Sequence, residues 1–191
     1  MNVRKVVVFV ALLNLAYFGV EFAVARAIGS VSLFADSVDF LEDASLNILI
    51  AVALGWGDSN RARLGMVLSG ILLIPGIATL WTAWEKVHSP LAPAAIPLSM
   101  TAAGALTINL CCAFLLLRFR KHSGSLTRAA FLSSRNDVFA NVAMIVTAVV
   151  TMYTRSGWPD LVVGLGIAAL NADAAHEVWG AARKEQKTVN Y

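Results

Sequence analysis

Charged residues are scarce in this sequence. Only 14% of the 191 residues are Asp, Glu, Lys or Arg, whereas 58% are hydrophobic and the mean hydropathy is +0.70. Soluble globular domains contain about 25% charged residues. The composition therefore excludes an ordinary soluble domain and predicts an integral membrane protein, with the lipid bilayer as its surroundings.

Cysteine is nearly absent. The two cysteines, Cys111 and Cys112, are adjacent within an apolar stretch. This spacing suits neither a disulfide nor a zinc knuckle, so we expect both to act as small buried hydrophobic residues. The basic residues, which leave a net charge of +3, lie at the ends of apolar runs and form no basic face. We therefore expect no nucleic acid partner.

Motifs for nucleotide binding and for hydrolysis are also missing. The chain has no GxxxxGK[ST] loop, so ATP is not expected to drive transport. It also has no HExxH or GxSxG, and neither Asp39 nor Asp137 has a flanking Gly of the kind that opens an intramembrane protease site, which argues against an intramembrane enzyme that uses paired aspartates as acid and base. We expect a protein that is not an enzyme and has no prosthetic group.

Long apolar runs, in contrast, fill the chain. Each is roughly 20 residues or more, which is enough to cross a ~30 Å hydrocarbon core. The first is too long for a signal peptide and no cleavage site follows it, so we keep it as a span. The sequence predicts an all-α polytopic membrane protein with six transmembrane helices, at residues 1–185, and a short cytoplasmic tail at 186–191. The six runs lie at about 6–28, 31–56, 64–87, 96–117, 129–153 and 160–181.

The distribution of basic residues predicts the orientation. Eleven Arg and Lys residues lie at one set of span ends and three at the other, with Arg135 inside the fifth span. Cytoplasmic loops carry the excess of basic residues, so both termini should be cytoplasmic. Trp81, Trp84 and Trp158 then lie near the outer surface, as interfacial aromatics do. We expect the protein in the plasma membrane, meaning the cytoplasmic or inner membrane.

Four carboxylates interrupt the second span, in SLFADSVDFLEDASLN at 32–47. Ionised residues inside a membrane are costly and mark ion or proton pathways. On a helix, Asp39 and Asp43 lie one above the other and share a stripe with Asp36 and Asn47, while Glu42 lies about 60° to the side. We predict that Asp39 and Asp43 bind a cation. Asp36, in the first turns after Gly29-Ser30, fits either a functional role or a role at the helix N-terminus.

A second polar stripe lies in the fifth span. Ser133, Asp137 and Asn141 are spaced i, i+4 and i+8, with Asn136 beside them. At about 1.5 Å per residue, Asp137 and Asp43 come out at the same depth, and so do Asn14 and Asn109. Arg135 points away from this stripe. It would pair with Glu42 or reach the cytoplasmic surface.

Two further polar groups remain open. In the first span, Asn14, Tyr17 and Glu21 share a face, and Glu21 would either line an exit path or be a buried, hydrogen-bonded residue. In the sixth span, Asp173, His176 and Glu177 share a face near the cytoplasmic end. They would form either a metal waypoint or interfacial charges paired with neighbouring Arg or Lys.

The chain resembles the cation diffusion facilitator family across all six spans. The segments that carry the resemblance are GSVSLFADSVDFLEDA, SRNDVFANVAMIV and PDLVVGLGIAAL, in spans two, five and six. Members exchange divalent metals for protons, are mostly homodimers, and take two site residues each from spans two and five, spaced i, i+4. By position, the resemblance implies Asp39, Asp43 and Asp137 as metal ligands.

The chain departs from the family pattern in two places. The fourth ligand, commonly His or Asp, falls on Ser133, so Asn136, Asn141 or a water would complete the site instead. Members usually also have a cytoplasmic metal-binding domain after span six, whereas this sequence ends at Tyr191. We therefore expect any homodimer to form through the transmembrane helices.

The expected function is divalent metal cation efflux by proton antiport. Crowded carboxylates repel one another, and metal binding displaces protons from them. The alternative is a module that binds or senses metal without transporting it. The candidate metal site, Asp39, Asp43, Asp137, Ser133 and Asn141, offers only oxygen, which favours Mn²⁺ as the transported substrate, with Fe²⁺ or Co²⁺ next. Zn²⁺, which binds most sites more tightly than Mn²⁺, is the main alternative.

Overall fold

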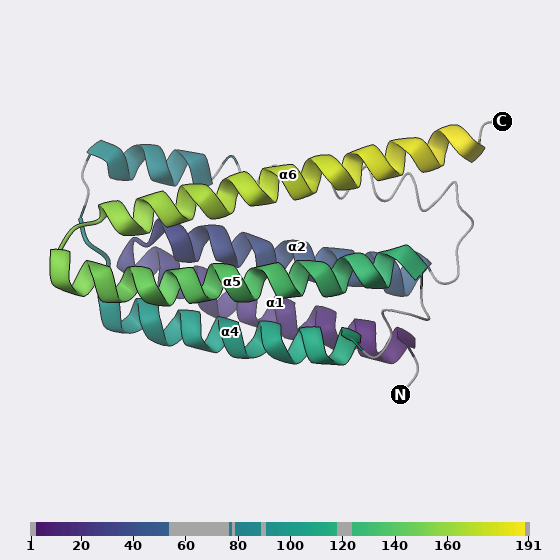
Figure 1. The fold of residues 1–191 in the computed structure, drawn as a ribbon, viewed down its shortest axis with the longest axis horizontal. Coiled ribbons are helices and arrows are strands. Elements are labelled where there is room, and N and C mark those ends of the chain that lie inside the picture. Colours follow the sequence, from purple (N-terminus) through teal and green to yellow (C-terminus); the bar gives the residue numbers. More distant parts are fainter. Residues whose placement is uncertain (1–2, 54–76, 78, 89–90, 118–123, 190–191) are drawn as a thin grey trace.

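The fold is all-helical throughout the part of the chain that the structure describes. A computed structural model describes residues 3–53, 77, 79–88, 91–117 and 124–189, and these contain helices and no strand (Figure 1). A shorter helical segment covers 79–88. The predicted all-α fold is confirmed. The long helices are α1 (Val3–Ile28), α2 (Val31–Ala53), α4 (Ala95–Leu117), α5 (Gly124–Thr154) and α6 (Trp158–Val189).

The long helices lie side by side in one bundle. Helix α1 begins and α6 ends at the same end, which we call the terminal end (Figure 1). The α1–α2 turn and the α5–α6 turn lie at the opposite end, which we call the turn end (Figure 1). Helix α2 packs against α1, α5 and α6, while α4 packs against α1 and α5. Helix α2, which holds four carboxylates, is therefore enclosed by three neighbours.

The helix ends at the turn end have local causes. Gly29 ends α1 with a φ of 64°, a conformation that a residue without a Cβ adopts at little cost. Ser30 then caps α2, because its Oγ accepts a hydrogen bond from the Leu33 N–H at 3.2 Å. At the other turn, the Arg155 N–H donates to the Thr151 carbonyl at 2.8 Å and closes α5.

The helices agree with most of the predicted spans. Three stretches are long and apolar enough to cross a membrane: Val3–Ile28, Ala95–Leu117 and Asp137–Thr154. Helix α2 is as long as a span but carries its carboxylates. Helix α5 begins at Gly124, before the predicted 129, and α6 continues to Val189, beyond the predicted 181, because helical hydrogen bonding does not stop at the membrane surface. Of the third predicted span, 64–76 and 78 lie outside the described residues.

Polar and apolar residues are distributed as a membrane protein requires. Large apolar side chains cover the outside, including Leu12, Phe114 and Phe139, which are 60%, 72% and 67% exposed. The buried residues include Asn14 and Glu21 at 0%. The outside surface is therefore suited to lipid, and the polar chemistry lies between the helices.

The two cysteines have different surroundings. Cys112 is buried, and its Sγ lies 3.5 Å from Asn14 Oδ1, to which it donates a weak hydrogen bond. Cys111 is exposed on the outside of the bundle. The expectation of two buried cysteines is therefore correct for Cys112 and wrong for Cys111, because adjacent residues of a helix point about 100° apart.

Candidate cation site

The carboxylates of α2 are largely removed from the surface. Asp36 is 0%, Asp43 2% and Glu42 6% exposed, and Asp39 is partly buried. Their helix lies between α1, α5 and α6, so these groups face protein rather than lipid. Burying charge in this way is costly unless a cation or proton offsets it.

Asp43 of α2 and Asp137 of α5 lie together. Their side chains share a hydrogen bond, and Asp39 is in electrostatic contact with Asp137. The two helices run side by side, and the equal depths that the sequence predicts for the two residues bring them into contact. Two carboxyl groups share a hydrogen bond only when one of them holds a proton.

Asp43 and Asp137 each have an asparagine four residues later on the same helix, and the two asparagines make the same kind of hydrogen bond. The Asn47 amide nitrogen donates to the Asp43 carbonyl at 2.8 Å, and the Asn141 amide nitrogen donates to the Asp137 carbonyl at 2.6 Å. Both asparagines are 0% exposed, and the Oδ1 of each has no hydrogen-bond partner among the described residues. Two buried amide oxygens on α2 and α5 are thus without a hydrogen-bond partner among the described residues.

Not all candidate ligands gather at one point. Among the described residues, no three His, Cys, Asp or Glu side chains form a group that could hold a metal ion. The side chains of Ser133, Arg135 and Asn136 lie outside the described part, so their predicted roles stay predictions.

Asp36 does not cap its helix. Ser30 caps α2, and no described donor reaches either oxygen of Asp36. The capping interpretation of Asp36 is therefore wrong. The Asp36 carboxyl group instead lies against that of Glu21 on α1, close enough for the two to share a hydrogen bond if one holds a proton.

A buried ionic network at the turn end escaped the sequence analysis. Asp160, in the first turn of α6, is 0% exposed and forms an ion pair with Lys86 Nζ at 2.8 Å. The same carboxylate accepts hydrogen bonds from Ser30 Oγ, Ser32 Oγ and the backbone N–H of Val31, at 2.6, 2.6 and 2.8 Å. Lys86 Nζ also donates to the Gly29 carbonyl. The network ties α2, α6 and the 79–88 segment together. The only sequence signal was an acidic residue directly after Trp158-Pro159.

Comparison with known proteins decides the family. The family profile described as the cation efflux transmembrane domain matches residues 7–179. The chain belongs to the cation efflux family. No curated protein matches the chain. The cation efflux family transports metal cations across membranes and is not a family of enzymes, so this chain is an integral membrane protein of a metal-transport family.

In this cation efflux domain the match covers every residue of the candidate site. Helices α2 and α5 lie within it, together with the Asp160 network and the Glu21–Asp36 pair. The resemblance that the sequence shows in spans two, five and six is therefore confirmed at the level of the family.

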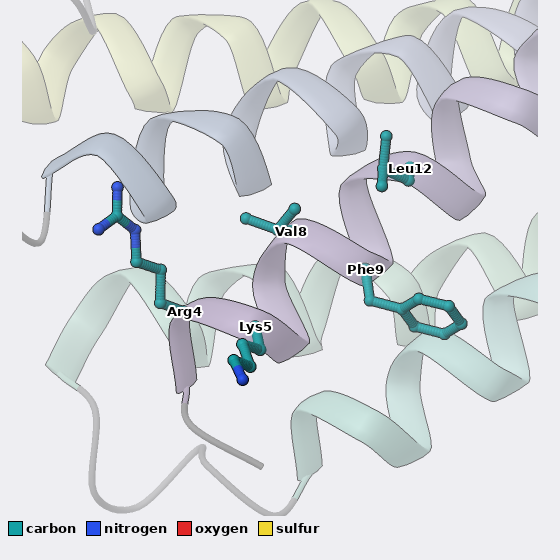
Figure 2. A pocket seen from close by; sticks show the side chains of 5 residues that line it. All are labelled: Arg4, Lys5, Val8, Phe9 and Leu12. Carbon is teal, nitrogen blue, oxygen red and sulfur yellow. The ribbon is translucent and has the colours of Figure 1, made fainter.

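Two other polar regions do not contribute to the site. Asp173 and His176 are exposed on α6, and the Glu177 side chain lies outside the described part. A hollow of about 410 Å³ lies on the outside of α1 near the terminal end (Figure 2). Its lining of Arg4, Lys5, Val8, Phe9 and Leu12 contains no acidic side chain, so this hollow is unsuited to a cation.

Proposed function

We propose that this protein exports a divalent metal cation from the cytoplasm in exchange for protons. The observation that carries the proposal is the pairing of Asp43 and Asp137 between α2 and α5, with Asp39 in electrostatic contact. A divalent cation among these three groups would neutralise most of their charge. Family membership supports metal transport in general. The identity of the ion and its coupling to protons are proposed from the residues of this site.

We further propose that the ligands are Asp39, Asp43, Asp137 and Asn141, with Ser133 or water completing the shell. The unpartnered Oδ1 of Asn141 supports its role, because burying a carbonyl oxygen without a partner costs free energy that a bound cation would recover. The i, i+4 hydrogen bond from Asn141 Nδ2 to the backbone carbonyl of Asp137 fixes the orientation of this amide group.

Oxygen ligands set the expected metal preference. Carboxylate, amide oxygen and water suit Mn²⁺ better than the His and Cys sets that are typical of Zn²⁺. We propose Mn²⁺ as the substrate, with Fe²⁺ or Co²⁺ next. Zn²⁺ is the main alternative because it binds most sites more tightly than Mn²⁺.

Proton coupling follows from the ligands themselves. Metal requires ionised carboxylates, whereas the shared hydrogen bond of Asp43 and Asp137 requires a proton. The site therefore cannot hold the metal and this proton at the same time. This exclusion is what an antiporter needs.

We propose cytoplasmic termini and a homodimer that forms through the membrane helices. The excess of basic residues at the terminal end supports the orientation. Helix α1 begins and α6 ends at that same end, which agrees with it (Figure 1). Cross-linking of single-cysteine variants in native membranes tests the dimer.

A panel of metal fluxes tests the function. The full chain is placed in sealed vesicles, and uptake of Mn²⁺, Fe²⁺, Co²⁺, Zn²⁺ and Cd²⁺ is compared at one pH. We expect Mn²⁺ flux from the wild type and none from Asp43→Asn, with Asp173→Asn as a control on an exposed carboxylate. Zn²⁺ or Cd²⁺ flux without Mn²⁺ flux would contradict the all-oxygen site. Binding without any flux would favour the metal-sensing module.

A further inference from the structure

Glu21 and Asp36 form a carboxyl pair outside the proposed metal ligands. Glu21 lies on α1 and Asp36 on α2, and the two helices pack against each other along their lengths. Both side chains are 0% exposed. Their carboxyl groups face each other within hydrogen-bonding contact, and no N–H or O–H of the described residues donates to any of their four oxygens.

Within the described part of the chain, no positively charged group is in electrostatic contact with the pair. Tyr17, one turn before Glu21, donates its hydroxyl hydrogen to the Thr101 carbonyl at 2.7 Å and so is not a donor to the pair. The charged groups that face the pair from α2 and α5 are Asp39, Asp43 and Asp137, all acidic. Helix α4 contains no charged residue.

Charged groups on the remaining elements are engaged elsewhere. In the described part of α6, Asp160 is paired with Lys86 and Asp173 is exposed. Two carboxylates that are in contact, buried and surrounded by further carboxylates repel each other when both are ionised, unless positive charge lies nearby. With no positive charge nearby, the pair should therefore hold a cation of its own, and the geometry indicates which one.

A proton fits the pair better than a metal ion does. A shared proton needs one oxygen from each carboxyl group, which this contact supplies. A divalent ion takes four to six ligands, whereas this pair supplies only two carboxyl groups and no described N–H or O–H group accompanies them. The pair is thus complete as a proton site and incomplete as a metal site.

We propose that Glu21 and Asp36 are a dedicated proton site of the antiporter, separate from the metal ligands. This inference rests on the proposed function. The pair shares a proton when the metal site is empty. When a divalent cation binds at Asp39, Asp43 and Asp137, its positive charge, about one helical turn from Asp36, drives this proton out. The O–H bond breaks, the proton passes to water, and the new negative charge is offset by the metal.

Counting released protons tests the inference directly. The full chain in detergent is titrated with Mn²⁺ in weak buffer with a pH dye, and bound Mn²⁺ is measured in parallel. We expect Glu21→Gln and Asp36→Asn to bind Mn²⁺ with unchanged stoichiometry and to release about one proton fewer per ion than the wild type. Thr151→Val, which removes a buried hydroxyl with no hydrogen-bond partner among the described residues, should release as many protons as the wild type.

The outcomes separate the two proposals. Wild-type protein that binds no Mn²⁺ and no other divalent ion would refute the proposed function. Wild-type binding with proton release that both variants retain in full would refute the inference alone. A loss of one bound Mn²⁺ per chain in the variants would also refute it, because the pair would then be a second metal site.

Infrared spectroscopy adds a readout that requires no metal binding. In a variant that carries Asp39→Asn, Asp43→Asn and Asp137→Asn, the protonated-carboxyl band of the pair should remain at neutral pH. Adding Glu21→Gln should remove this band or shift it, because the shared proton loses one of its two oxygens. A spectrum that is the same with and without Glu21→Gln would contradict the shared proton, even if other variants failed to fold.

Discussion

Replacing Asp160 by alanine should destabilise the whole turn end of the bundle. The substitution removes the partner of Lys86, whose side chain is 9% exposed, and the acceptor of the hydrogen bonds from Ser30, Val31 and Ser32. Removing one member of a buried ion pair costs about 3–5 kcal/mol, because the other charge stays buried. Losing an acceptor at the N-terminus of α2 adds about 1 kcal/mol. We expect a total loss of about 4–6 kcal/mol.

This loss is large enough to measure as a change in melting temperature. For a chain of this size, each kcal/mol shifts Tm by about 2–4 °C, so Asp160→Ala should lower Tm by roughly 10 °C or more. Tryptophan fluorescence in detergent suits the assay, because Trp84 and Trp158 lie on two of the three elements that the Asp160 network joins. The control is Asp173→Ala, an exposed carboxylate on the same helix.

A second variant separates charge from packing. Lys86→Met together with Asp160→Asn leaves no unpaired buried charge, so it should be more stable than Asp160→Ala alone. A Tm for Asp160→Ala equal to that of Asp173→Ala would show that the network contributes little, and the reasoning would be wrong.

Three further predictions concern packing and orientation. Gly164→Ala would place a Cβ 2.7 Å from the backbone of Val31 and Ser32, so it should cost about 1–3 kcal/mol in thermal unfolding, whereas Gly166→Ala, with nothing within 4 Å, should not. Gly104→Ala would place a Cβ 2.2 Å from Tyr17 Oη, so it should also lower Tm, and Tyr17→Phe should restore part of the loss; a larger loss in the double variant would contradict this contact. Reporters at Pro93 and Ser156 should read outside and a reporter at Val3 inside; the reverse reading would overturn the orientation.

The fold was largely predictable because apolar length and helix geometry act locally. The rise of about 1.5 Å per residue was enough to place Asp43 and Asp137 at one level, and their contact agrees with it. The i, i+4 spacing likewise anticipated that Asn141 lies beside Asp137. The second relation lies within one helix, and the first lies between two helices whose directions were predicted.

Relations that depend on which helices pack together were not predictable. Asp160 is 130 residues from Ser30, and the sequence of neither segment indicates that the two are in contact. The sequence left the role of Asp36 open for the same reason, since its neighbour Glu21 is on another helix. The exposure of Cys111 depends on the rotation of α4 about its axis, which a uniformly apolar helix does not reveal.

Simultaneous measurement of metal and proton movement tests the central claim most directly. Sealed vesicles containing the full chain and a pH dye receive an inward Mn²⁺ gradient, and both ions are followed in the same sample. The account predicts Mn²⁺ entry with proton exit in the wild type, and neither movement in Asp43→Asn or Asp137→Asn. Mn²⁺ entry without a pH change, or full exchange in both variants, would contradict a carboxylate site that takes metal and protons in turn.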